Sequence, residues 1–140
     1  GAQALLETLV LMERGELRPQ PQPSEGASYA SKIQKEEARL DFNLPGAQLD
    51  RVVRAFNPSP VAFTTFRGET LRVWRAEPVA QLEAGAAPGA LGLRADGSVT
   101  VACGAGALLL KDVQRPGGKP MSAAAWAAGN QLKAGERLGL

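Results

Sequence analysis

Two prolines one residue apart, in the stretch Asn57-Pro58-Ser59-Pro60, constrain this chain more than any other feature. Each proline fixes φ and removes a backbone donor, so a helix that reaches them must end there. Residues 49–56 repeat apolar side chains at helical spacing, whereas residues 61–113 break into short alternating runs. We therefore expect a helix that turns sharply into a β-rich region.

The helix before this corner has a predicted start and a predicted buried face. Asn43 is expected to cap it, with Pro45 in its first turn. Arg51 and Arg54 lie off the apolar face and are expected to meet solvent. The buried stripe is predicted at Leu49, Val52, Val53 and Phe56.

Short strands are expected after the corner, and turn residues separate most of them. The predicted strands are residues 61–66, 70–76, 78–83, 89–94, 98–103 and 107–113. Asp96-Gly97 between two runs is the best hairpin signal. Ser122 is expected to cap an Ala-rich helix that ends near Ala128. The fold class expected is mainly β with a few helices, built as a small antiparallel OB-like Greek-key barrel.

The first part of the chain reads differently. Residues 2–14 are predicted to form a helix with an apolar stripe at Leu5, Leu9 and Met12, and no capping signal precedes it. Such a helix is either cut from something longer or an ordinary first helix. We expect residues 1–14 to pack on the barrel or on a second copy of the chain. Packing on a second copy would be self-association. Residues 15–31 carry prolines at positions 19, 21 and 23 and are expected to form a spacer.

The composition excludes several classes of chemistry. The chain of 140 residues has no His and one Cys. The commonest general base and metal ligand are therefore missing, and an independent hydrolase or metalloenzyme is not expected. With no intramolecular disulfide available, we expect a cytoplasmic protein. No apolar run is long enough to form a membrane helix, so no membrane partner is expected.

Charge is unevenly distributed along the chain. Residues 1–28 hold two of the 16 basic side chains and four of the 14 acidic ones, so the remainder carries the basic excess. Such an excess is typical of nucleic-acid binding and also of many inert surfaces.

The stretch TLRVWRA places Arg72 and Trp74 on one face of a strand and Leu71, Val73 and Arg75 on the other. An arginine beside an aromatic ring can hold a nucleic-acid backbone and stack on a base. We favour core packing for Trp74, because large aromatic side chains are usually buried.

Two glycine-containing stretches are candidate phosphate sites. VACGAGAL lacks the third glycine and the following helix of a dinucleotide-binding loop, so we interpret it as a tight turn between strands. PGGK carries Lys119 on a loop, where it is either a phosphate contact or a solvated side chain.

Three stretches in order resemble one family. FNPSPVAFTTFRGETLRVWRA resembles the FNPWPGAY…RLKIWRA signature in the C-terminal domain of methionyl-tRNA formyltransferases. SKIQKEEARLDFNLP resembles the segment that enters that domain. CGAGALLLKDVQRPGGKPMSAAAWAAGN and GERLGL resemble its closing region. The resemblance runs from about Ala27 to the last residue.

This resemblance implies a domain organisation and a role. Residues 1–18 would be the last helix of a missing N-terminal formyltransferase domain, 19–31 the linker, and 32–140 the C-terminal OB-like barrel. The barrel would bind initiator methionyl-tRNA while the missing domain transfers formyl from 10-formyltetrahydrofolate in translation initiation. No catalytic position carries over, so the fragment is expected to be inactive alone and to bind no cofactor.

Two positions depart from the family pattern. Ser59 stands where the pattern has Trp, and Val61 stands where it often has Gly. The loss of the Trp either leaves a gap that a neighbour fills or alters the tRNA face.

The expected RNA contacts are basic side chains spread over the linker, the helix, one strand and the closing loop. They are Lys32, Lys35, Arg39, Arg51, Arg54, Arg72, Arg75, Lys111 and Lys119. An alternative is a structural or docking module of a formyltransferase that acts on a sugar nucleotide or folate, with no RNA role. A third is a free-standing OB-like binder of single strands, for which 5% aromatic residues leaves few stacking platforms.

Overall fold

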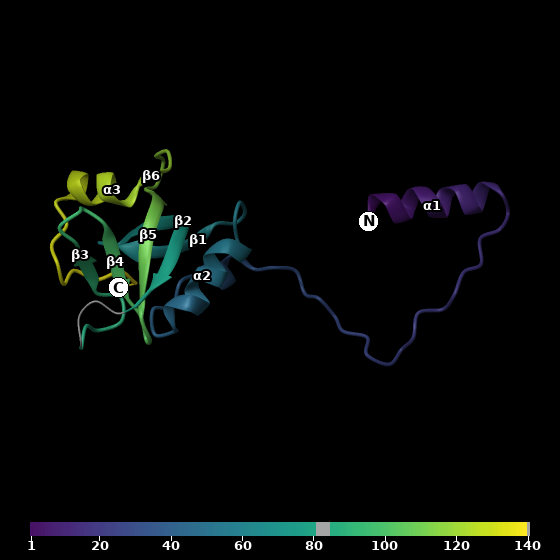
Figure 1. The fold of residues 1–140 in the computed structure, drawn as a ribbon, viewed down its shortest axis with the longest axis horizontal. Coiled ribbons are helices and arrows are strands. Elements are labelled where there is room, and N and C mark those ends of the chain that lie inside the picture. Colours follow the sequence, from purple (N-terminus) through teal and green to yellow (C-terminus); the bar gives the residue numbers. More distant parts are fainter. Residues whose placement is uncertain (81–84, 140) are drawn as a thin grey trace. The chain divides into compact units, whose positions relative to one another are not determined.

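The computed structural model of the chain describes residues 1–80 and 85–139 and contains two compact units, residues 1–32 and 33–140 (Figure 1). The first unit holds helix α1, Ala2–Glu13, which confirms the helix predicted over residues 2–14. All residues of α1 are exposed, including Leu5, Leu9 and Met12. Residues 15–34 form no helix or strand.

The second unit combines a sheet with two helices and one short 3-10 helix. Its helices are η1 (Lys35–Ala38), α2 (Gly46–Ala55) and α3 (Ala123–Asn130). Its strands are β1 (Ala62–Phe66), β2 (Glu69–Val79), β3 (Leu91–Leu93), β4 (Val99–Ala102), β5 (Ala107–Gln114) and β6 (Met121–Ser122). This is the β-rich domain with a few helices that the sequence predicts.

The six strands pair antiparallel in the order β1-β2-β5-β4-β3, and β6 pairs with β5. The sheet is open along this path, with β1 and β3 at its two ends, rather than a closed ring of ladders. Helix α2 packs on β2 and β5, whereas α3 packs on β4, β5 and β6 (Figure 1).

The core fills the space between the sheet and the two helices. Leu49 and Val53 enter it from α2, and Trp126 enters it from α3, where its ring meets Phe66 edge to face at 5.1 Å between centroids. The predicted stripe of α2 is confirmed, since Val52 and Phe56 are half-buried beside it. Burial of this apolar face is what holds a ten-residue helix, because a helix so short is marginal alone.

Several local predictions hold. The Asp96-Gly97 turn joins β3 and β4 as an antiparallel hairpin, and Gly97 has a positive φ of 80°. The Ser122 hydroxyl accepts a hydrogen bond from the Ala125 amide at the start of α3, as an N-cap does. The expected strands 61–66, 89–94, 98–103 and 107–113 are found as β1, β3, β4 and β5. Residues 70–76 and the start of 78–83 form one strand, β2, and residues 81–84 lie outside the described residues. Strand β6 is not among the expected strands.

The predicted cap of α2 is wrong. Helix α2 begins at Gly46, with Pro45 at the N-cap position and no side-chain cap. The Asn43 amide groups instead donate to the Asp41 carboxylate, at 3.0 Å from the backbone nitrogen and 2.8 Å from Nδ2. The first helical donor, the Gly46 amide, is satisfied from a distant segment by the Ala105 carbonyl at 2.9 Å. A long-range partner thus replaces the local cap.

The corner after α2 adopts an uncommon backbone. Both the Asn57–Pro58 and the Ser59–Pro60 peptide bonds are cis. Val61, at the position where the family pattern often has Gly, has φ of 72° while its side chain is buried. That left-handed region favours glycine, and a β-branched residue there is an outlier. Ser59 is exposed at the corner.

The chain's last described residues tie the two ends of the open sheet together. On the β3 side, the Leu91 amide donates to the Glu136 carbonyl at 2.7 Å and the Leu138 amide donates to the Gly89 carbonyl at 2.9 Å. On the β1 side, the Gly139 amide donates to the Thr65 carbonyl at 2.9 Å. We call residues 133–139 the C-terminal strap.

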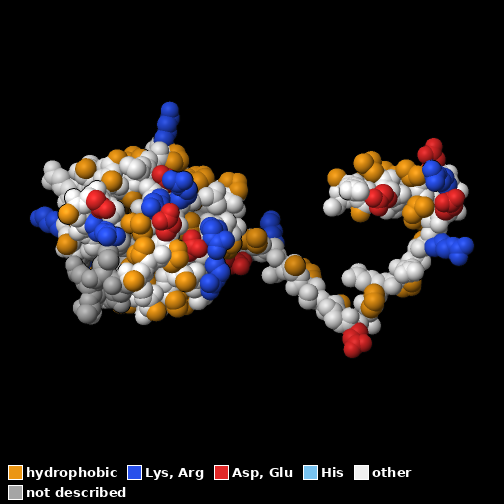
Figure 2. All heavy atoms as spheres, in the orientation of Figure 1, with side chains coloured by type: hydrophobic (Ala, Val, Ile, Leu, Met, Phe, Trp, Pro, Cys, Tyr) orange, Lys and Arg blue, Asp and Glu red, His pale blue; other side chains and the backbone are white. Residues whose placement is uncertain are grey.

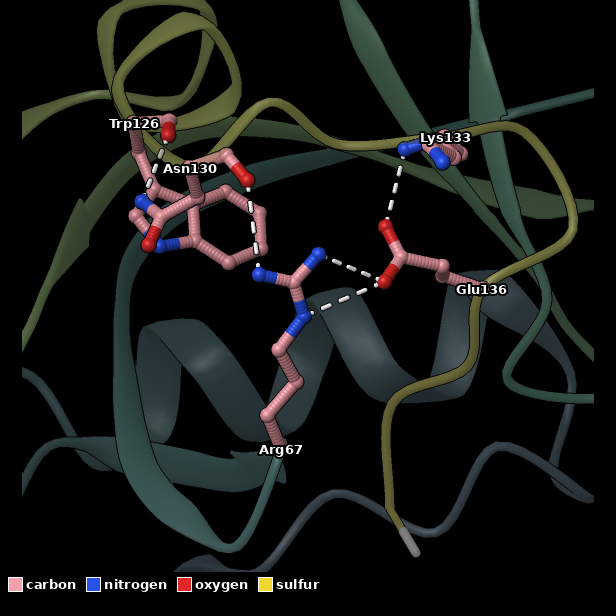
Figure 3. Close-up of polar contacts among 5 residues, drawn as sticks. All are labelled: Arg67, Trp126, Asn130, Lys133 and Glu136. Carbon is pink, nitrogen blue, oxygen red and sulfur yellow. Dashed lines mark hydrogen bonds and ion pairs between the residues drawn. The ribbon is translucent and has the colours of Figure 1, made fainter.

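An ion pair anchors this strap to the β1–β2 turn (Figure 3). The Arg67 guanidinium donates through Nε and Nη2 to one Glu136 carboxylate oxygen, at 3.1 and 2.7 Å. The other oxygen accepts from the Lys133 amide at 2.8 Å. The Lys133 amide and the Arg67 guanidinium hold the pKa of the Glu136 carboxyl below its ordinary value.

Glycine is required where α2 meets the turn between β4 and β5. A Cβ on Gly104 would lie 1.9 Å from the Asn43 carbonyl oxygen. The Gly104 amide donates to the Phe42 and Leu44 carbonyls at 2.9 and 3.1 Å. The glycines of VACGAGAL thus serve as a tight turn between strands, as expected, and dock the start of α2 on it.

We predict that Gly104→Ala lowers the free energy of unfolding by about 1–3 kcal/mol or more, because backbone must move to admit the methyl group. Urea unfolding measures this change. The matched control is Gly129→Ala in α3, where a Cβ meets nothing within 4 Å; alanine should raise stability there by about 0.5–1 kcal/mol. Equal stability of the two variants would contradict the close approach at Gly104.

We also predict that Glu136→Gln lowers the melting temperature at pH 7. Because the folded-state pKa is depressed, the carboxylate's contribution is present above the ordinary value of 4.5 and is lost as pH falls through the folded pKa. The difference from the unsubstituted chain should therefore shrink in acid. Glu69→Gln, at the exposed start of β2, should leave the melting temperature unchanged. A pH-independent difference for Glu136→Gln would contradict the role of its charge.

Candidate nucleic-acid interface

The outward face of β1, β2 and β5 carries a row of polar and aromatic side chains. Phe63 pairs with Arg72 across β1 and β2, and Arg72 pairs with Gln114 across β2 and β5. Residues directly opposite in antiparallel strands share a face. Leu71 and Val73, which flank Arg72 in sequence, are buried on the other face. The predicted alternation in this part of β2 is therefore confirmed, with Arg72 exposed.

Trp74 is half-buried on the outward face rather than in the core, which corrects the preferred expectation for it. Its indole Nε1 donates to Gln114 Oε1 at 2.9 Å, and Gln114 Nε2 donates in turn to the Gly118 carbonyl at 2.7 Å. The core tryptophan is Trp126, which is 1% exposed. Gln114 of β5 and Gly118 of the following loop thus fix the position of the Trp74 indole.

A β-bulge corrects the expected position of Arg75. Simple alternation would place Arg75 on the buried face with Leu71 and Val73. The pairing of β2 with β5 shifts between Val73 and Ala76, so that Trp74 and Arg75 both point outward before Ala76 returns to the interior. The Arg75 guanidinium pairs with the Asp112 carboxylate across the strands.

A groove of about 400 Å³ lies where the end of α2 meets β2 and β5. Asn57, Trp74 and Ala76 form part of its walls, and the Asn57 Nδ2 group donates to the Trp74 carbonyl at 2.8 Å. Its charged walls come from Arg54, Arg75, Lys111 and Glu77. We call it the α2–β2 groove.

Three of the nine predicted contacts meet at the α2–β2 groove, and each has an acidic partner. Arg54 pairs with Asp50 at 3.0 Å one helical turn earlier, and Lys111 pairs with Glu77 at 3.0 Å. Arg75 pairs with Asp112 as described. Basic and acidic side chains accordingly lie next to one another on the face shown in Figure 2.

The other predicted contacts are exposed and spread over the second unit, apart from Lys32, which ends the first unit. Lys35 Nζ lies 5.9 Å from the centre of the Phe63 ring, which links η1 to the outward face. Arg39 lies beside the edge of β1, where its backbone bridges to Phe63. Arg51 is exposed on α2, and Lys119 is exposed on the loop after β5. Within residues 1–80 and 85–139, no acidic side chain is found in an ion pair with Arg51, Arg72 or Lys119.

Sequence reasoning missed three residues of this face: Phe63, Asn57 and Gln114. The sequence predicts Phe63 only as part of the strand 61–66, in which alternation puts its side chain on the face opposite the buried Thr64. Asn57 is predicted only to end a helix, and Gln114 lies just after the predicted strand 107–113. Their roles depend on contacts 17 and 40 residues away, to Trp74, for which a single sequence carries no signal.

Neither an activated thiol nor a cluster of metal ligands is found in the described part of the chain. Burial raises the pKa of the Cys103 thiol to about 11, so it is a poor nucleophile. No group of three acidic, Cys or His side chains within the described ranges could hold a metal ion. Among the described helices, none has the length and apolar character needed to cross a membrane.

The chain matches a known family and several curated proteins. Residues 32–131 match the family described as formyl transferase, C-terminal domain. The chain is 49% identical to a methionyl-tRNA formyltransferase of Thiobacillus denitrificans, over 99% of this chain and 44% of that protein. It is 45% identical to one of Neisseria meningitidis serogroup A, again over 99% of this chain and 44% of that protein. The chain thus spans less than half the length of these relatives.

Solved structures show the same fold at lower identity. HypX from Aquifex aeolicus aligns with a TM-score of 0.70 and 22% identity, over 96% of this chain and 24% of that one. A structure of the same protein in complex with tetrahydrofolic acid aligns with a TM-score of 0.68 and 23% identity, over the same shares. At this identity the likeness concerns the fold alone.

Proposed function

This chain belongs to the formyl transferase C-terminal domain family, and we propose that it is the tRNA-docking part of a methionyl-tRNA formyltransferase. The observation that carries the proposal is the 45–49% identity, along almost the whole chain, to relatives that bear that name. Such an enzyme formylates methionyl initiator tRNA in the cytoplasm, and 10-formyltetrahydrofolate is the formyl donor we assign to it.

The chain's own part in this reaction is to bind and orient the RNA. Exposed guanidinium and ammonium groups hold phosphates and sugars, while the rigid sheet fixes their spacing. The acceptor end of the tRNA is then presented to a catalytic domain formed by another part of the protein. With no His in the chain and a buried, weakly acidic Cys103, proton transfer and nucleophilic attack belong to that other domain.

We assign residues 1–18 to the end of that catalytic domain, 19–31 to a linker and 32–140 to the tRNA-docking domain. The exposed apolar side chains of α1 support this division, because a helix with Leu5, Leu6, Leu9 and Met12 all at least half exposed lacks a partner surface within its own unit. In the isolated chain the same side chains favour self-association through residues 1–14.

The test replaces three contacts that have no acidic partner among the described residues, Arg51, Arg72 and Lys119, with Ala. Initiator tRNA binding should weaken, and the slope of log K against log salt should become shallower by about 2–3, since each lost phosphate contact removes about 0.7–0.9 from it. Fluorescence anisotropy across a salt series measures both quantities.

The control variant replaces Arg18, Arg94 and Lys133 with Ala. None of these is a predicted contact, and the net charge changes by the same amount. This variant should bind tRNA like the unsubstituted chain, apart from a small general loss of attraction. Equal affinity and equal salt slope for the two triple variants would overturn the proposed face. Absence of tRNA binding by the unsubstituted chain would instead favour a docking module without an RNA role.

A further inference from the structure

Two arginines of the α2–β2 groove form ion pairs with aspartates that lie outside the groove. Arg54 contacts Asp50 through Nε at 3.0 Å, and Arg75 contacts Asp112 through Nε as well. The arginine side chains are 67% and 71% exposed, whereas the aspartates are 16% and 32% exposed. The arginines line the groove and the aspartates do not. The acidic groups therefore orient the guanidinium groups without occupying the groove.

Each of these contacts uses the Nε edge, which leaves the Nη groups for a further acceptor. A guanidinium has five N–H donors in a fixed fork, and the pair of donors at its end matches two oxygens of a phosphate. Exposed ion pairs contribute only about 0–1 kcal/mol, so their partners are easily shared with an incoming anion. The lining side chains include three cations against one carboxylate, Glu77.

Trp74 is the aromatic residue that lines the groove, and it is half-buried. Its polar edge is already satisfied by Gln114, and its backbone carbonyl accepts from Asn57. The part of the ring that remains accessible is apolar and flat, which is the surface on which a nucleobase stacks. The groove volume of about 400 Å³ lies within the roughly 300–1,000 Å³ of small-molecule sites, which is large enough for a single nucleotide.

We propose that the α2–β2 groove binds one unpaired nucleotide of the RNA, with its phosphate on the Nη edges of Arg54 and Arg75 and its base stacked on Trp74. A paired base inside an A-form duplex keeps its faces stacked on its neighbours, so only an unpaired or extruded nucleotide can enter. Asp50 and Asp112 are positioning residues in this arrangement. The inference rests on the proposed RNA-docking function and names what one part of that surface recognises.

The experiment measures binding of the full chain to a blunt RNA duplex and to the same duplex with a short single-stranded extension. The unsubstituted chain should bind the extended duplex about tenfold more tightly, as expected for one stacked base. Trp74→Leu should abolish this preference for the extended duplex. Trp74→Phe, which keeps a ring face, should retain most of it. Arg75→Lys should reduce it, because a lysine keeps the charge but not the fork.

Arg94→Lys, an exposed arginine at the end of β3 outside the groove, is the matched control and should change nothing. Titration of the chain with adenosine monophosphate should also shift the NMR signal of the Trp74 indole N–H. This signal is identified by its loss in Trp74→Phe. This second readout keeps the test decisive if the leucine variant does not fold.

The outcomes separate this inference from the proposed function. Binding of tRNA and of the blunt duplex, with no gain from the extension or no effect of Trp74→Leu on that gain, would overturn the nucleotide site and leave RNA docking intact. Failure to bind any of these RNAs would overturn both. A preference for the extension that Arg75→Lys and Trp74→Leu each reduce would establish the site.

Discussion

The arrangement of this domain depends on a backbone crossing that only glycine permits. At Gly104, the turn between β4 and β5 approaches Asn43 so closely that a Cβ would lie 1.9 Å from a carbonyl oxygen. The Gly104 and Gly46 amides then donate across the crossing, to Phe42, Leu44 and Ala105. These bonds fix where α2 starts. Its apolar stripe fixes how it lies on β2, and Arg54 and Asn57 reach the groove as a result.

The surface that this framework presents is nearly balanced in charge. Three of the nine predicted contacts carry an acidic partner, while Arg51, Arg72 and Lys119 have none among the described residues. Partnered arginines keep donors for a further acceptor, because exposed ion pairs are weak. In the proposed RNA docking, the unpartnered cations would supply the long-range attraction to phosphate. A net charge of only +2 is therefore compatible with RNA docking, since position rather than total charge determines the contacts.

Local patterns in the sequence predicted most helices and strands. Features that depend on long-range contacts could not be predicted in this way. The stripe of α2, the Asp96-Gly97 hairpin and the Ser122 cap depend on neighbours within a few residues, and each was predictable. The start of α2 was not, because its first donor is satisfied by Ala105, nearly 60 residues away. Nor was the bulge that turns Arg75 outward, or the strap that joins β1 to β3. Of the candidate site, the basic residue types were predictable, whereas the groove that gathers three of them was not.

The tRNA-docking proposal is tested by comparing binding of this chain to initiator tRNA and to a single-stranded RNA of similar length across a salt series. We expect weak, salt-sensitive binding that favours the folded tRNA, because the contacts are spaced by a rigid sheet and meet phosphates fixed in tertiary structure. Equal binding of both RNAs would show a surface that attracts any polyanion. Absence of binding to either, at low salt, would contradict the claim that this domain docks tRNA.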